Sequence, residues 1–128
     1  MNATHQFETK VMFTGIEHSD TVTDYIEKKL ALAKRILSGG ADGMRGIFRV
    51  EVGRTTNHHR TGEVFRAEIN FTGGGYSARA VSERDDLYAA LDDAKDDLDR
   101  ELKRARKKKV TLVRRGGIAL KNMLRGFR

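Results

Sequence analysis

The sequence predicts an α+β domain in which two helices cover one face of a four-stranded sheet. Three observations carry this prediction. Segments with alternating apolar residues, typical of strands, occur once near the N-terminus and three times in the middle of the chain. Two segments with apolar residues every three or four positions, typical of helices, follow the first and the last of them. The resulting order, β-α-β-β-β-α, favours a two-layer sandwich.

The N-terminal third is predicted to form the first strand and the first helix. Residues 5–15 (HQFETKVMFTG) alternate imperfectly and are expected to be a strand. Ser19 can cap the helix that follows, because its hydroxyl can accept a backbone N–H of the first turn. The apolar stripe of this helix consists of Val22, Ile26, Leu30, Ala33 and Leu37. The glycine-rich segment 38–46 (SGGADGMRG) is expected to end the helix in a loop.

Three further strands are expected in the middle of the chain. Residues 47–53 (IFRVEVG) alternate, with Phe48, Val50 and Val52 on one side. Residues 63–71 (EVFRAEINF) show the clearest alternation. Their predicted inward residues are Phe65, Ala67, Ile69 and Phe71. TGGG is then a hairpin turn, and YSARA is a strand that places Tyr76, Ala78 and Ala80 inward.

A long helix is predicted at the end of the domain. Ser82 and Asp85 have the spacing of a capping box, so the helix is expected to begin at Ser82. Its apolar stripe consists of Leu87, Leu91, Ala94, Leu98, Leu102 and Ala105. As far as about Lys108 the helix would be ~40 Å long. Lys109 falls on the stripe, so the packed helix is expected to end or to leave the core there.

Length and composition bound the class of protein. The 128 residues suit one domain, residues 1–109, followed by a basic C-terminal arm, residues 110–128, which is expected to be flexible. The arm either orders on a partner or docks on its own domain, and the sequence leaves both open. No apolar run is long enough for a membrane span, and the N-terminus lacks a secretory signal pattern. The absence of cysteine excludes disulfides and fits a cytoplasmic protein.

Charge is strongly polarised along the chain. Residues 1–99 carry 13 Lys/Arg and 17 Asp/Glu, a net charge of 13 − 17 = −4, whereas residues 100–128 carry 12 Lys/Arg and one acid, a net charge of +11. Complementation of the helix dipole explains two or three cations at the end of a helix, but not seven. The excess predicts binding of a polyanion, most often a nucleic acid, over the alternative of a solvated basic tail.

No enzymatic, metal or cofactor site is expected. Asp92, Asp93, Asp96 and Asp97 are predicted to lie on the outward, solvated face of the last helix, where carboxylates are not tuned for catalysis. His58 and His59 are adjacent and need a third ligand to hold a metal. The glycine-rich segments lack the Lys-Ser/Thr pair of a phosphate-binding loop.

Several segments resemble one known family. SERDDLYAALDDAKDDLDRELKRARKKK is similar to the second-helix signature of the ribosome hibernation-promoting factors, also called ribosome-associated inhibitor A or protein Y. HSDTVTDYIEKKLALAKRIL resembles the first helix of that family, and HRTGEVFRAEINFTGGGYSARAVS resembles its third and fourth strands. The resemblance covers about residues 8–109 and is to the short form of the family, without a C-terminal dimerising domain.

The resemblance implies a fold similar to a double-stranded-RNA-binding domain and a ribosomal partner. Family members bind the small ribosomal subunit in the channel for mRNA and tRNA and inhibit translation under stress or in stationary phase, with no membrane or small-molecule substrate involved. Basic residues on both helices would meet rRNA phosphates. Carried over by position, these are Lys28, Lys29, Arg35, Arg100, Arg104, Arg106 and Lys107, and the charge pattern adds Lys103, Lys108, Arg114 and Arg115.

Two other functions fit the same residues. A general RNA-binding module would use these cations without a preferred ribosomal site. A regulator of transcription would act through contacts with another protein.

Overall fold

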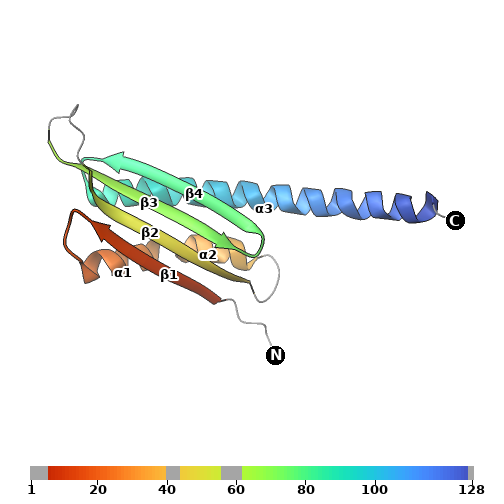
Figure 1. Cartoon of the computed structure of the whole chain (residues 1–128), viewed down its shortest axis with the longest axis horizontal. Coiled ribbons are helices and arrows are strands. Elements are labelled where there is room, and N and C mark those ends of the chain that lie inside the picture. Colours follow the sequence, from red (N-terminus) through yellow and green to blue (C-terminus); the bar gives the residue numbers. More distant parts are fainter. Residues whose placement is uncertain (1–5, 40–43, 56–61, 127–128) are drawn as a thin grey trace.

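A computed structural model places a four-stranded sheet on one side of the described chain and helices on the other (Figure 1). It describes residues 6–39, 44–55 and 62–126, with side chains as far as Lys108. This architecture confirms the predicted α+β sandwich. Its elements are β1 (Gln6–Thr14), α1 (Asp20–Lys29), α2 (Ala31–Ser38), β2 (Arg45–Thr55), β3 (Val64–Gly73), β4 (Tyr76–Arg84) and α3 (Leu87–Gly126).

The sheet has the strand order β1-β2-β3-β4. β1 and β2 are parallel, so the chain must cross over between them, and α1 and α2 form this crossover. The other two pairs are antiparallel. Gly74 and Gly75 form the two-residue turn between β3 and β4 with φ values of 56° and 83°. Positive φ at both positions is typical of a type I′ turn, which explains the glycines of TGGG.

The core lies between the sheet and the helices. Most predicted inward residues of the middle strands are buried, with Phe48, Val52 and Phe71 fully so, but Phe65 is only half-buried. α3 packs mainly against β4 and β3, and its predicted stripe is confirmed, because Leu91, Ala94, Leu98 and Leu102 are buried. A buried apolar stripe fixes which sides of α3 remain for polar contacts.

The first helix is divided in two, which the sequence did not predict. Leu30 separates α1 from α2 and has φ −79° and ψ −5°, near the edge of the right-handed helical region. Helical hydrogen bonds continue across it, from Leu30 N to Ile26 O and from Lys34 N to Leu30 O, both at 3.0 Å. Leu30 is fully buried, so the bend keeps the whole apolar stripe on the core.

The predicted start of the last helix was wrong. Ser82 lies in β4 and pairs with Ala67 of β3, because the ladder between these strands continues as far as Arg84. α3 begins at Leu87 instead. The Asp86 carboxylate accepts a hydrogen bond from Ala89 N at 2.9 Å, as a capping residue does.

α3 is longer than the packed segment that the sequence predicted. It does not end near Lys109 but continues to Gly126, and Figure 1 shows it extending beyond the sheet. Forty residues of α-helix span ~60 Å. No helix in the described part of the chain combines the length and the apolar character needed to cross a membrane.

The open face of the sheet, opposite the helices, carries charges of both signs. A row of pairs across the strands joins Lys10, Arg49, Asn70 and Arg79. Beside this row, Glu68 forms ion pairs with Arg79 and, at 3.4 Å, with Arg66. This mixture does not favour a polyanion on the sheet.

Replacing Leu98 tests the assignment of the core. Leu98→Ala removes a fully buried side chain, so we expect a loss of about 2–5 kcal/mol in the free energy of unfolding. Urea denaturation measures this loss. Met12→Ala is the control, because Met12 is 61% exposed on β1, and we expect a change within about 0.5 kcal/mol. Equal losses for both variants would contradict the assignment.

Candidate nucleic-acid interface

α1 and α2 run beside α3 in the same direction, and contacts at both ends fix this arrangement. Near the start, the rings of Tyr25 and Tyr88 meet edge to face with centroids 4.8 Å apart. Near the other end, Arg106 of α3 donates hydrogen bonds to the last turn of α2. Residues of the two helices about 67 positions apart in sequence therefore lie at the same level.

The contact near the start is a small polar cluster. The Tyr25 hydroxyl donates a hydrogen bond to Asp92 at 2.5 Å, and Lys29 Nζ lies 3.3 Å from the same carboxylate. Lys29 Nζ also sits 5.1 Å from the centre of the Tyr25 ring. Asp92 raises the pKa of the Tyr25 phenol and of the Lys29 ammonium, because its carboxylate favours their protonated forms.

The predicted solvated position of the aspartates is therefore wrong for Asp92, which joins α3 to α1. Asp93 also has partners outside α3, with Arg84 at 2.6 Å and Ser82 at 3.4 Å. Asp97 pairs with Arg100 of its own helix, and Asp96 is exposed beside Lys95. The sequence placed these residues on the wheel relative to the core, but it did not show that α1 and β4 approach the helix from its sides.

Asp99 is a buried acid that the sequence analysis missed. It is 4% exposed, and its carboxylate lies 3.0 Å from Lys95 Nζ. The Asp99 carboxylate raises the pKa of Lys95. Lys95 and Asp99 continue the helical spacing of Tyr88 and Asp92, so they lie on the same flank of α3, which faces α1 and α2. Their spacing of four was the available signal for this pair.

The predicted cations fall into three groups according to their contacts. Lys28, Arg35, Lys103 and Lys108 are exposed and form no salt bridge with the side chains that the structure describes. Arg100 and Arg104 form exposed ion pairs with Asp97 and Glu101, three residues earlier on α3. Lys29 and Arg106 hold helices together.

Three further predicted residues, Lys107, Arg114 and Arg115, belong to none of these groups. Lys107 is exposed. Arg114 and Arg115 lie on the backbone of α3, and their side chains are outside the described residues.

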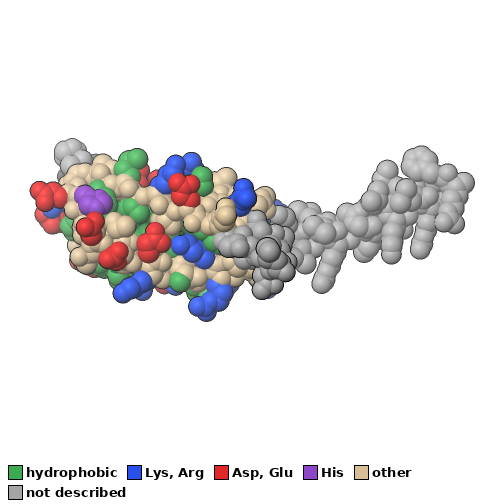
Figure 2. Space-filling view, turned by 90° about the horizontal axis from the view of Figure 1, so that it is seen from below, with side chains coloured by type: hydrophobic (Ala, Val, Ile, Leu, Met, Phe, Trp, Pro, Cys, Tyr) green, Lys and Arg blue, Asp and Glu red, His purple; other side chains and the backbone are tan. Residues whose placement is uncertain are grey.

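Three of the exposed cations, Arg35, Lys103 and Lys108, lie towards the same end of the helix pair, whereas Lys28 is next to Lys29 and lies at the level of the aspartates. Arg35 of α2 lies at the level of Lys103 of α3, whereas Asp92 and Asp96 lie closer to the start of both helices. Figure 2, which is seen from below Figure 1, shows acidic side chains mainly at one end of the described body and, further along, Lys and Arg side chains with some acids among them. We call the exposed cations Lys28, Arg35, Lys103 and Lys108 the helix-face cations. An exposed group of like charges suits phosphates on a polyanion.

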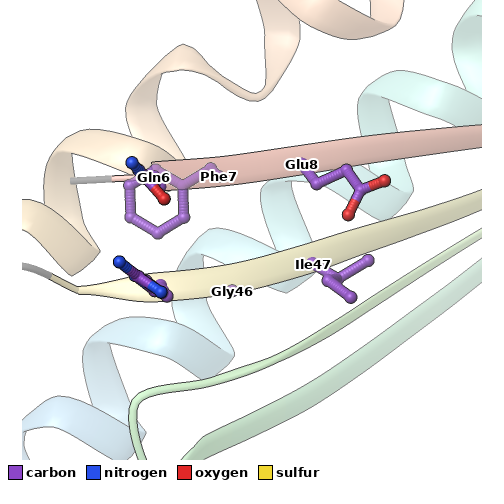
Figure 3. Close-up of a pocket in the computed structure, with 6 residues that line it drawn as sticks. Gln6, Phe7, Glu8, Gly46 and Ile47 are labelled. Carbon is purple, nitrogen blue, oxygen red and sulfur yellow. The ribbon is translucent and has the colours of Figure 1, made fainter.

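Other candidate sites do not compete with this surface. A hollow of about 500 Å³ lies where β1 and β2 begin, and Figure 3 shows Gln6, Phe7 and Glu8 of β1 beside Gly46 and Ile47 of β2. It has no set of converging acids, bases or nucleophiles. Within the described residues, no three His, Asp or Glu side chains are placed to bind a metal. His58 and His59 lie outside these residues, and His18 contacts Asp20 at 2.8 Å.

Comparison with known proteins identifies the family. Residues 9–110 match the family described as sigma 54 modulation protein / S30EA ribosomal protein. The chain belongs to this family. The resemblance of its two helices and later strands to the hibernation factors is thereby confirmed. No curated protein matches the S30EA chain.

One solved structure agrees with this membership. The N-terminal domain of Protein Y from Thermus thermophilus is 30% identical, with a TM-score of 0.54, and the match covers 81% of the S30EA chain and 98% of that domain. A ribosomal subunit interface protein from Coxiella burnetii is 19% identical, with a TM-score of 0.49, over 80% and 98% of the two chains.

The polar cluster at Asp92 predicts an alkaline shift in one tyrosine. We expect Tyr25 to ionise above the ordinary value of about 10, and Asp92→Asn to lower its pKa, because the carboxylate favours the neutral phenol. A raised folded-state pKa means that this contribution to stability is complete below about pH 10 and is lost as the pH rises through the raised value. NMR titration of ¹³C-labelled tyrosine measures the pKa.

Asp96→Asn is the matched control for this titration. Asp96 lies one helical turn further along α3 but is exposed and contacts Lys95 rather than Tyr25. We expect the Tyr25 pKa to stay unchanged in this variant. An equal shift in both variants would mean that general charge, rather than the hydrogen bond, sets the pKa.

Proposed function

We propose that this protein is a ribosome hibernation factor of the cytoplasm. It binds the small ribosomal subunit in the channel for mRNA and tRNA and inhibits translation under stress or in stationary phase. Membership of the S30EA family supports a ribosomal partner, and the helix-face cations support rRNA as the surface contacted. The activity needs no cofactor, small-molecule substrate or catalytic step.

The proposal rests on the register of α2 against α3, which places the exposed cations Arg35 and Lys103 at the same level of two adjacent helices. Neither side chain is neutralised by an acid among the described side chains, so both are free to meet phosphates. Contacts with phosphates position a protein without reading sequence, and the shape of the channel would supply the preference for one site.

Arg100 and Arg104 extend this surface. Their ion pairs with Asp97 and Glu101 are exposed, and exposed pairs of this kind are typically worth only about 0–1 kcal/mol. A phosphate group can therefore replace each acid at a small cost in free energy. We place these two residues among the rRNA contacts and propose Lys107, Arg114 and Arg115 as further contacts.

The proposed function divides the chain into a domain and an arm, with the boundary within α3. We propose that residues 1–109 form the ribosome-binding domain and that residues 110–128 form a basic arm. The family match ends at residue 110, and α3 continues as far as Gly126. The net charge of +11 on residues 100–128 supports contact with rRNA on both sides of this boundary.

A regulator of transcription is a second candidate, because the description of the family names sigma 54 modulation. That function requires a protein partner. Its complex would survive nuclease treatment and high salt, whereas a complex held by phosphates would be lost in both. Pull-down from lysate with and without nuclease, followed by identification of the bound proteins, separates the two candidates.

Charge reversal on the helix face tests the proposed interface. We expect Arg35→Glu with Lys103→Glu to weaken binding to small subunits by more than about tenfold, because two phosphate contacts become repulsions. Co-sedimentation at fixed salt measures the affinity. The melting temperature should change little, since both side chains are exposed.

Arg49→Glu with Lys10→Glu is the matched control. It makes the same change in net charge on the open face of the sheet, where both residues are exposed. We expect a much smaller loss of affinity. If both double variants bind equally weakly, net charge rather than a helix-face site governs binding.

Competition distinguishes the ribosomal channel from general RNA binding. We expect mRNA with tRNA bound to the small subunit to exclude the protein. A protein that stays bound beside both ligands would contradict the proposed site.

A further inference from the structure

Arg106 is the one predicted rRNA contact whose guanidinium lies on another helix of the described chain. One Nη donates a hydrogen bond to Ile36 O at 3.2 Å, and the other donates to Gly39 O at 2.6 Å. Both acceptors belong to the end of α2, at the last turn and its capping residue. The side chain is half-buried, unlike the exposed Arg104 two residues earlier.

This contact satisfies a specific requirement of α2. The last carbonyl groups of a helix have no N–H partner within it, and they carry its partial negative charge. The planar guanidinium offers several donors in a fixed fork and can bridge two such oxygens, which a lysine cannot do in the same way. α2 is only eight residues long, so its end depends strongly on contacts from outside the helix.

Gly39 makes room for the guanidinium. A Cβ at this position would lie 2.7 Å from Nη1 of Arg106 and 3.1 Å from Cζ. The φ of Gly39 is −72°, which any residue can adopt, so the glycine is not needed for the backbone conformation. Alanine at position 39 would therefore displace the guanidinium while keeping the charge of Arg106 and an unstrained chain.

We propose that Arg106 is a positioning residue and not a phosphate contact. It clamps the end of α2 to α3 and thereby holds Arg35 at the level of Lys103, so that the two helices present their cations as one surface. The inference rests on the proposed function, because the surface it positions is the proposed rRNA interface. It also separates Arg106 from its neighbours Arg104 and Lys107, which we retain as contacts.

The decisive comparison is between Arg106→Ala and Gly39→Ala. One variant deletes the cation, and the other keeps the cation but forces its guanidinium to shift away from Gly39. If Arg106 is a positioning residue, both variants should weaken binding to small subunits by the same factor, about fivefold. A positioning role also predicts that the slope of log affinity against log salt concentration changes by the same amount in both variants, because both displace Arg35 and neither removes a phosphate contact made by Arg106 itself.

Arg104→Ala is the control for a true contact. Its removal should weaken binding and reduce the salt slope by about one. The proposal is overturned if Arg106→Ala lowers the slope in the same way while Gly39→Ala binds as tightly as the wild type or more tightly. It is also overturned if Arg106→Ala has no effect on affinity.

Amide hydrogen exchange of the free protein tests the clamp without the ribosome. We expect the amides of the last turn of α2 to exchange about tenfold faster in Arg106→Ala and in Gly39→Ala, and at the wild-type rate in Arg104→Ala. If the wild type fails to bind small subunits, the proposed function is wrong, and the exchange rates alone then decide whether Arg106 holds α2. Unchanged exchange in both variants would refute the clamp.

Discussion

The direction of every charged side chain on α3 depends on burial of its apolar stripe. Leu91, Leu98 and Leu102 pack into the core, and this fixes the rotation of the helix about its own axis. One flank is then turned towards α1 and α2, where Tyr88, Asp92 and Arg106 find their partners. The outward side is left to exposed cations such as Lys103. The same leucines that stabilise the fold therefore sort the charges into those that join helices and those that can meet a ligand.

Charge on the helix layer is consequently less uniform than the composition suggests. Acids near the start of α3 are used in contacts with α1 and β4, and these contacts remove Lys29 from the pool of accessible cations. Beyond Asp99, α3 carries one acid, Glu101, and a run of basic residues. The gradient along one helix becomes a gradient across a surface because α1 and α2 run parallel to α3. Antiparallel packing would have placed Arg35 beside the aspartates.

Much of the fold could be predicted from periodicity, because each buried stripe leaves a trace in a short window of sequence. This holds for Phe48, Val50 and Val52 of β2 and for the leucines of α3, all of which are buried as expected. The exact start of α3 could not be predicted from periodicity, since Ser82 and Asp86 both have side chains that can cap a helix. Pairing with β3 decided between them. The break between α1 and α2 at Leu30 likewise depends on packing, and no local sequence pattern indicates it.

The residue types of the candidate site could be predicted from the sequence, but the contacts that each residue makes could not. Spacing placed Arg104 and Arg106 on the same basic helix end, and nothing local shows that one is exposed while the other reaches α2. That difference arises from contacts between positions about seventy residues apart in sequence. The hydrogen bond from Tyr25 to Asp92 escaped prediction for the same reason.

The parallel pairing of β1 with β2 has a consequence for the order in which the chain folds. Gln6 lies opposite Arg45, so this ladder closes a long loop, whereas β3 and β4 meet across a two-residue turn. Long-range closure costs more chain entropy before any contact forms. We expect the hairpin of β3 and β4 to be structured in the transition state and β1 to dock late, a sequence of events that φ-values in β1 and β4 would reveal. β1, the first strand in the sequence, would thus be the last one to join the sheet.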